Sequence, residues 1–323
     1  MPTSEAAVLP GAVLPTKYWI KLQPDLARFT FEGEERISVE VVEPTSEIVL
    51  NAVELQIEAA TLHRGETATG ARQITFDMSR ETVTLDFGGP IPPGPATLEI
   101  KFAGELNDKL RGFYRSEYTA SGGEQRYLAA TQFEATDARR AFPCWDEPAR
   151  KAKFEVALVI PATLLAISNT AVADESPAGP DLKTIHFAET PVMSTYLLAF
   201  VVGDLTHIEQ QATDTTRVAV WTTRGKEEQG RFALNTSVQL LSFFNDYFGI
   251  PYPLEKLDHI AIPDFAAGAM ENWGAITYRE IALLVDPVNS SAGTRQRVAE
   301  VIAHEMAHMW FGDLVTMEWW DDL

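Results

Sequence analysis

Two histidines and a glutamate that could do metal chemistry stand in the run His-Glu-Met-Ala-His at positions 304–308. Apolar residues around this run predict a helix, and residues four apart on a helix share one face. The imidazoles of His304 and His308 would then lie one turn apart and could take two corners of a tetrahedral zinc site. Glu305 would stand beside the metal, placed to take a proton from water. We therefore expect one zinc ion, with His304 and His308 as ligands and Glu305 as the general base.

A third protein ligand is usual for a hydrolytic zinc, and this run does not contain one. A third histidine six positions after His308 is excluded because Leu314 stands there. Asp313 and Glu318 are nearby carboxylates, but we expect them at or past the end of the helix, where neither is well placed to fold back onto the metal. The third ligand must therefore come from elsewhere.

Two other segments carry weaker signals. In Gly-Ala-Met-Glu-Asn at 268–272, the small residues would let an extended backbone approach another peptide closely, and Glu271 could face a cationic group. The competing interpretation is a loop with a surface glutamate. The stretch 131–140 contains Glu134 among mixed charges, and from the residues alone an ion-paired loop is favoured.

The aromatic residues Trp310, Phe311, Trp319 and Trp320 are interpreted as core packing. Cys144 is the one cysteine, so no internal disulfide can form, and we expect it to be a buried, small, apolar side chain.

The elements that must position these residues change in type along the chain. Alternating apolar residues at 37–41, 98–102 and 154–160 predict strands, and many short strands in the first two hundred residues favour an antiparallel β domain. Later residues predict a strand at 218–221, helices at about 226–248 and 294–311 with Gly312 as the cap of the second, and the start of a new helix at 319–323. We therefore place a domain boundary near residue 210, giving domains 1–210 and 211–323.

Composition limits the partners. The 323 residues include 46 acidic and 26 basic side chains, a net charge of -20, which argues against nucleic acid or an anionic membrane as a partner. The apolar run at 197–202 is much shorter than the roughly 20 residues that span a bilayer. Residues 1–16 do not resemble a secretory signal. We expect a cytoplasmic protein.

Taken together, the motifs resemble the gluzincin zinc aminopeptidases: Gln132 and Glu134, then Gly-Ala-Met-Glu-Asn at 268–272, then His-Glu-Met-Ala-His at 304–308. The run Arg-Ala-Phe-Pro-Cys-Trp-Asp-Glu-Pro at 140–148 is similar to the puromycin-sensitive and alanyl aminopeptidase branch. The resemblance implies a saddle-like antiparallel β domain followed by a thermolysin-like catalytic domain.

The resemblance also implies roles for single residues. Glu271 and Glu134 would hold the α-ammonium group of a peptide substrate, with Gln132 beside them. The backbone of Gly268 and Ala269 would pair with the substrate as a strand does. Met270 would line the first side-chain pocket, and Asn272 of the same motif is also expected to bind the substrate.

In the family, the third zinc ligand is a glutamate nineteen residues after the second histidine, which would be position 327. We therefore expect this sequence to be an N-terminal portion that stops before the third ligand and the oxyanion-stabilising tyrosine. The missing C-terminal part of the same protein is then a candidate partner.

Three functions are compared. The first is a zinc-dependent aminopeptidase acting on peptides with a free N-terminus. The second is an inactive fragment that binds peptides or a partner chain, since two histidines alone should hold zinc weakly. The third is an epoxide-hydrolysing relative, in which Gln typically replaces Glu134 and Gly-Gly-Met-Glu-Asn replaces the motif at 268–272; both differences favour the peptidase.

Overall fold

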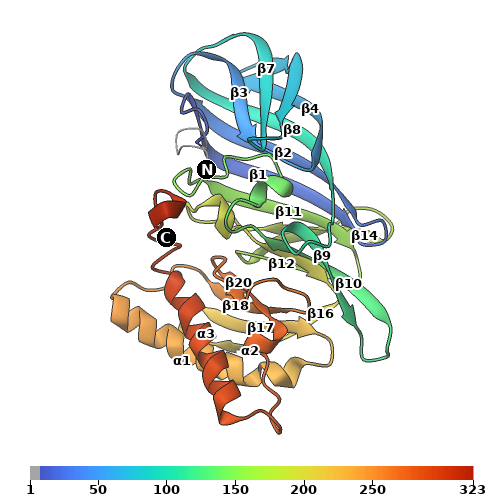
Figure 1. Ribbon diagram of the computed structural model, residues 1–323, viewed down its shortest axis with the longest axis vertical. Helices are drawn as coiled ribbons and strands as arrows, with labels where there is room; N and C mark the ends of the chain where they lie inside the picture. The colour runs from blue at the N-terminus through green and yellow to red at the C-terminus, as the bar shows by residue number, and fades with distance from the viewer. Residues whose placement is uncertain (1–7, 323) are drawn as a thin grey trace.

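The N-terminal half is built on one large twisted sheet. A computed structural model describes residues 8–322, and Figure 1 shows this sheet above a smaller one, with the helices at the opposite end. Its eight strands have the order β13-β14-β11-β1-β2-β8-β4-β5. Buried residues alternate along the long strands, as the sequence pattern requires of a sheet with one face on the core. The strands are β1 (Val13–Asp25), β2 (Thr30–Val41), β4 (Leu55–Arg64), β5 (Thr67–Gly70), β8 (Gly94–Glu105), β11 (Lys153–Pro161), β13 (Val172–Pro177) and β14 (Leu182–Phe187).

The predicted β domain is confirmed, with one parallel pair inside it. β1 and β11 run parallel, from the pair Lys17 and Lys153 to the pair Leu22 and Leu158. A parallel pair needs a long crossover, and here the chain forms one further sheet and two strands of another before it returns. A three-stranded sheet has the order β3-β7-β6, and a four-stranded sheet the order β12-β15-β10-β9. Their strands are β3 (Thr45–Asn51), β6 (Gln73–Asp77), β7 (Thr82–Ile91), β9 (Gly112–Thr119), β10 (Gln125–Gln132), β12 (Leu165–Ser168) and β15 (Phe200–Gly203).

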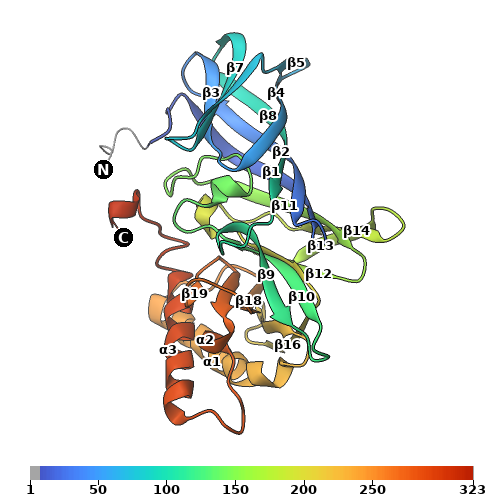
Figure 2. The same ribbon diagram turned by 45° about the vertical axis from the view of Figure 1, so that its right-hand side comes forward.

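The C-terminal part is a five-stranded sheet with helices packed beside it (Figure 2). The strand order is β16-β17-β18-β20-β19, with β17, β18 and β20 parallel and β16 and β19 antiparallel at the two edges. Helix α1 packs on β16 and β17, and α3 packs on α1. The strands are β16 (Leu205–Gln211), β17 (Arg217–Thr223), β18 (Lys256–Ile262), β19 (Ala269–Met270) and β20 (Ala275–Arg279).

Both long helices form close to the predicted ranges. The 3-10 helix η4 (Glu227–Gly230) leads directly into helix α1 (Arg231–Phe248). Helix α1 ends at Gly249, whose φ of 66° is left-handed. Helix α3 (Ala292–His308) begins at the N-cap Ser291, whose side chain accepts a hydrogen bond from the Thr294 amide. The remaining helices are α2 (Glu280–Leu283), η2 (Ala138–Arg140), η3 (Thr195–Leu197) and η5 (Trp320–Asp322).

One expectation near the C-terminal end is wrong. Helix α3 ends at His308 rather than at 311, because the chain turns there and the Asp313 amide donates to the His308 carbonyl at 2.9 Å. The start of a helix expected at 319–323 is present as the short 3-10 helix η5, and position 323 lies outside the described residues.

Core packing holds for only part of the predicted aromatic cluster. Trp310 is buried and stacks on Phe248, whereas the Phe311 side chain is 75% exposed, so that prediction is wrong for Phe311. Trp319 and Trp320 are half-buried. Cys144 is fully buried as expected, and burial raises the pKa of its thiol.

The described residues contain no helix that is long and apolar enough to cross a membrane. The expectation that no secretory signal is present rests partly on residues 1–7, which lie outside the described residues.

Candidate active site

Helix α3 brings the two predicted imidazoles to one point. The Nε2 atoms of His304 and His308 are 3.2 Å apart, with the ring planes at 84°. In a tetrahedral zinc site with Zn–N bonds of about 2.0–2.1 Å, neighbouring ligand atoms lie about 3.3 Å apart. Two ring nitrogens at this separation need a proton or a cation between them. The spacing therefore fits a zinc ion held by both residues.

The backbone after the helix fixes the orientation of His308. Its Nδ1 lies 3.0 Å from the carbonyl oxygen of Phe311, so Nδ1 carries the hydrogen and Nε2 keeps a lone pair for a metal. Gly312 has a φ of +150°, and a Cβ atom there would lie 3.0 Å from Nδ1 of His308. Gly312, expected to be a helix cap, instead lets the chain pass close to the imidazole.

Three carboxylates from distant segments converge beside the histidines. Glu305, Glu271 and His308 each offer a ligand atom within 4.8 Å of the other two. Burial raises the pKa of Glu305 to about 8, and the negative charges of Glu271 and Glu134 add to this shift. Burial also raises the pKa of Glu134, followed by the charge of Glu271. This concentration of negative charge favours cationic ligands.

Glu271 directly follows β19 and is only 8% exposed, so the interpretation as a surface glutamate is wrong. Burial raises the pKa of its carboxyl as well. The carboxylate therefore belongs to the enclosed part of the site.

The stretch 131–140 divides into two parts. Arg139 and Arg140 form ion pairs, for example between Arg139 Nε and Asp146 at 2.9 Å, as an ion-paired loop predicts. Within residues 8–322, Glu134 takes part in none of the ion pairs. Gln132, the last residue of β10, has a buried Oε1 with no hydrogen-bond partner in the described part. The loop interpretation therefore fails for Glu134.

The motif at 268–272 lies along a sheet edge. Ala269 pairs with Tyr278 of β20 on one side, and no other strand of the described chain follows β19 in the sheet order. Gly268 is exposed, and its carbonyl accepts from the Arg279 amide. An unpaired strand edge can accept an added peptide strand.

The other two residues of this motif point inward. Met270 is fully buried, and the Asn272 amide donates to Thr277 Oγ1 at 3.0 Å. Both side chains therefore support the β19–β20 hairpin that places Glu271.

Two buried side chains near the site were not predicted to belong to it. Asp313 is fully buried, and the charges of Glu271 and Glu305 contribute to the raised pKa of its carboxyl, after burial. Tyr196 is buried in an apolar stretch, and Glu271 contributes to its raised pKa, again after burial. An apolar run offers no local signal for such a tyrosine. Asp313 could be noticed only as an acid in an otherwise apolar segment.

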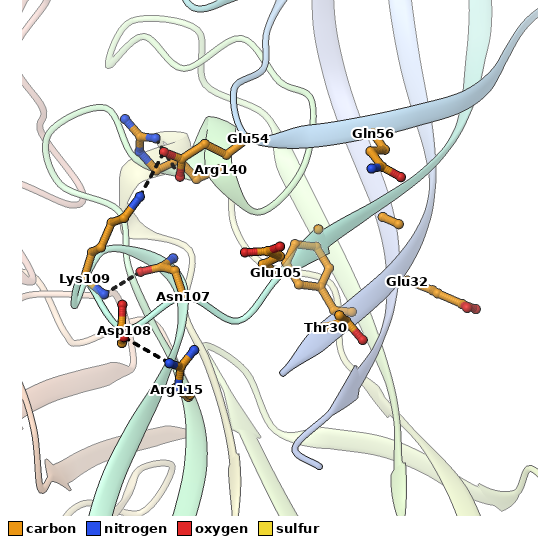
Figure 3. A pocket seen from close by; sticks show the side chains of 13 residues that line it. Thr30, Glu32, Glu54, Gln56, Glu105, Asn107, Asp108, Lys109, Arg115 and Arg140 are labelled. Atoms are coloured by element: carbon orange, nitrogen blue, oxygen red, sulfur yellow. Dashed lines mark hydrogen bonds and ion pairs between the residues drawn. The ribbon is translucent and has the colours of Figure 1, made fainter. Parts of the chain in front are cut away.

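A large cleft elsewhere holds none of the predicted residues. It encloses about 760 Å³ beside β2, β4 and β8 (Figure 3). Its cations are already paired: Arg140 with Glu54 at 3.0 Å, Lys109 with Glu54 at 3.4 Å, and Arg115 with Asp108 at 3.0 Å. The cleft therefore presents no free positive charge to an anionic ligand.

Comparison with known proteins gives two family matches. The Peptidase M1 N-terminal domain matches residues 14–197, and the Peptidase family M1 domain matches residues 232–323. Aminopeptidase M1-B of Oryza sativa subsp. japonica is 51% identical over 317 residues, which are 98% of this chain and 36% of the rice protein. Puromycin-sensitive aminopeptidase of Caenorhabditis elegans is 46% identical over 98% of this chain and 33% of its own length. The chain thus spans about a third of the length of these relatives.

A third relative is of similar length to this chain. Aminopeptidase N of Acetobacter pasteurianus is 46% identical over 319 residues, 98% of this chain and 88% of the bacterial sequence. Both family domains are matched, in order, and the converging histidines and carboxylates lie within or beside them. This chain belongs to the peptidase M1 family.

Proposed function

We propose that the protein is a zinc-dependent aminopeptidase that hydrolyses the first peptide bond of peptides with a free N-terminus. The observation that carries this proposal is the convergence of two imidazoles and three carboxylates on one partly buried site. The names of the relatives agree with it, since each is called an aminopeptidase.

The amine of the substrate is bound by Glu134 and Glu271. Burial raises the pKa of both carboxyls, and the charge of Glu271 raises that of Glu134 further, so the two gain most from a ligand that brings positive charge. An acetylated N-terminus brings none and leaves both carboxylates unpaired. Gln132, whose buried Oε1 has no partner among residues 8–322, adds an acceptor to this subsite. The free edge of β19, at Gly268 and Ala269, aligns the peptide backbone, and Met270 and Asn272 hold the hairpin in place.

His304 and His308 hold zinc, and the 3.2 Å between their Nε2 atoms fits that role. When bound, zinc supplies Lewis-acid activation of water and of the peptide carbonyl. The Glu305 carboxylate takes the proton of the attacking water and delivers it to the leaving amine. Its ligand atom lies within 4.8 Å of those of His308 and Glu271, which supports this role.

Three further expectations belong to this proposal. They are a third zinc ligand at position 327, a domain division into 1–210 and 211–323, and action in the cytoplasm. The charge of -20 disfavours nucleic acid and anionic membranes as partners.

The test is hydrolysis of leucyl and alanyl anilides, with zinc content measured on the same samples. It is run on the 323-residue chain and on a form that continues through position 327. We expect the longer form to cleave free-amine substrates and to spare their N-acetyl analogues. A longer form that binds zinc but cleaves neither would disprove the peptidase. A short chain that binds free-amine peptides without cleaving them would support the alternative of an inactive binding fragment for this chain.

Glu305→Gln tests the general base in the longer form. We expect zinc to be retained and turnover to fall by roughly two to four orders of magnitude. Glu300→Gln is the matched control, because Glu300 is exposed on the same helix. Equal turnover in the two variants would remove Glu305 from the mechanism.

A further inference from the structure

Asn169 is a fully buried residue whose side-chain amide forms three hydrogen bonds. It directly follows β12. Its Nδ2 donates to the carbonyl oxygens of Leu197 at 2.7 Å and of Trp273 at 2.9 Å, and its Oδ1 accepts from the Ala199 amide at 2.9 Å. Both N–H donors and the oxygen of the side chain are thus in use, so the amide is held in one orientation.

These hydrogen bonds join two sheets that are far apart in sequence. Ala199 directly precedes β15 of the four-stranded sheet, whereas Trp273 lies between β19 and β20 of the five-stranded sheet. The turn also approaches the backbone of Asn169 closely. Gly274 has a φ of 77°, and a Cβ atom added there would collide with the Asn169 carbonyl oxygen. Asn169 therefore contacts the turn through both its side chain and its backbone.

Each side of this link is close in sequence to one carboxylate of the proposed amine subsite. Glu271 stands two residues before Trp273, whose carbonyl accepts from Asn169. On the other side, the chain continues from Ala199 into β15, and the neighbouring strand β10 ends two residues before Glu134. The position of one carboxylate relative to the other therefore depends on the hydrogen bonds of Asn169.

We propose that Asn169 is a positioning residue of the amine subsite, which holds the segment of Glu271 in place relative to that of Glu134 so that both carboxylates meet one α-ammonium group. This inference rests on the proposed function, because it assumes that the two glutamates bind the amine. Like charges repel, so two carboxylates stay together only where the surrounding structure holds them. Holding them before the ligand arrives lowers the cost of binding it.

Asn169→Ala removes all three hydrogen bonds. The probes are leucinamide and N-acetyl-leucinamide, titrated into the 323-residue chain and followed by saturation-transfer NMR, which needs no turnover. We expect Kd for leucinamide to rise about ten-fold, as the loss of one hydrogen bond between charged groups would give. Binding of the acetylated probe should not change.

Ser168→Ala is the matched control. Ser168 is the buried neighbour of Asn169, and its Oγ donates to the carbonyl oxygen of Ala199 at 2.8 Å, without contact to the turn at Trp273. We expect this variant to lower Tm and to leave Kd for leucinamide unchanged. If Ser168→Ala raises Kd as much as Asn169→Ala does, Asn169 acts through stability alone and the inference is wrong.

Thr131→Val tests the same link if Asn169→Ala does not fold. It keeps the shape of the side chain and removes only the hydrogen bond that Oγ1 accepts from the Phe200 amide at 3.1 Å. Thr131 stands three residues before Glu134, and Phe200 directly follows Ala199. We expect Kd for leucinamide to rise about three-fold, with no change for the acetylated probe. Wild-type affinity for leucinamide in Thr131→Val would then refute the inference.

A double-variant cycle separates positioning from stability. Glu134→Gln should weaken leucinamide binding in the wild-type chain, and should weaken it less in an Asn169→Ala background, where the two carboxylates no longer meet one ammonium group. A purely structural role for Asn169 would leave the effect of Glu134→Gln the same. If the wild-type chain prefers leucinamide over its acetyl form and the effects of the two variants simply add, the inference is wrong and the proposed function stands. If the wild-type chain shows no preference, both are wrong.

Discussion

His304 Nε2 and His308 Nε2 lie 3.2 Å apart on α3, the separation of two neighbouring ligands of one tetrahedral ion. His308→Ala removes a ligand itself and should therefore lower zinc affinity by at least about 100-fold. Loss of a hydrogen bond that only orients a ligand costs less. Competition with a chromogenic chelator measures this directly. His207→Gln is the control, because His207 belongs to β16, away from α3, and pairs with Glu209. Equal zinc affinity in both variants would contradict the site.

Gly312→Ala tests the turn that orients His308. An added Cβ would meet His308 Nδ1 at 3.0 Å, at a φ that side chains rarely adopt. The bond from Nδ1 to the Phe311 carbonyl would then be distorted, and zinc affinity should fall about 10–100-fold. Gly293→Ala, on the helix that carries His308, is the matched control, since its nearest contact would be an ordinary 3.7 Å. If both variants bind zinc alike, the turn does not orient the ligand.

The part of the site that sequence predicts well is local. His304, Glu305 and His308 lie within one helical turn, so their common location follows from helix geometry alone. Glu134 and Glu271 follow strands of two different sheets, and no local pattern shows that they meet. Their pairing was expected only from the family resemblance. Tyr196 could not be found at all, because its hydroxyl is significant only in relation to distant carboxylates.

The fold shows the same division. Alternating residues predict strands, but the parallel pairing of β1 with β11 depends on the path of the intervening chain. Phe311 was placed in the core because apolar spacing does not show which face another element covers. Helix α3 ends early because of long-range turn contacts around Asp313, which helix-stop signals do not describe.

His259 makes the stability of the fold depend on pH. Burial lowers the pKa of its imidazole to about 4, so the folded protein keeps it neutral. Below the ordinary imidazole pKa of about 6.5, His259 binds a proton in the unfolded chain but not in the folded protein. The contribution of the neutral His259 to the free energy of unfolding is therefore complete above pH 6.5. It is lost as pH falls toward 4, by about 3 kcal/mol in all.

His259→Gln should unfold more easily at pH 7, because Nδ1 pairs with the Tyr278 hydroxyl at 2.9 Å. The informative result is the slope: between pH 6.5 and 4 its free energy of unfolding should fall less steeply than that of the wild type. Urea titrations at four pH values measure it. Parallel curves for His259→Gln and wild type would refute the assignment.

Glu35 should make stability depend on pH in the opposite direction to His259. It is fully buried on β2, neither carboxylate oxygen has a partner in the described part of the chain, and burial raises its pKa well above 4.5. The folded protein favours the neutral acid over the carboxylate. The contribution of Glu35 to the free energy of unfolding is therefore complete below pH 4.5 and is lost as pH rises toward the pKa of the folded state. The glutamine in Glu35→Gln cannot ionise. The difference in free energy of unfolding between Glu35→Gln and wild type should therefore be more favourable to the variant at pH 8 than at pH 4.5, by about 1 kcal/mol or more. Glu40→Gln, exposed on the same strand, should show no such difference between the two pH values. If Glu35→Gln is stabilised over wild type by the same amount at both pH values, packing and not the buried charge determines the stability difference.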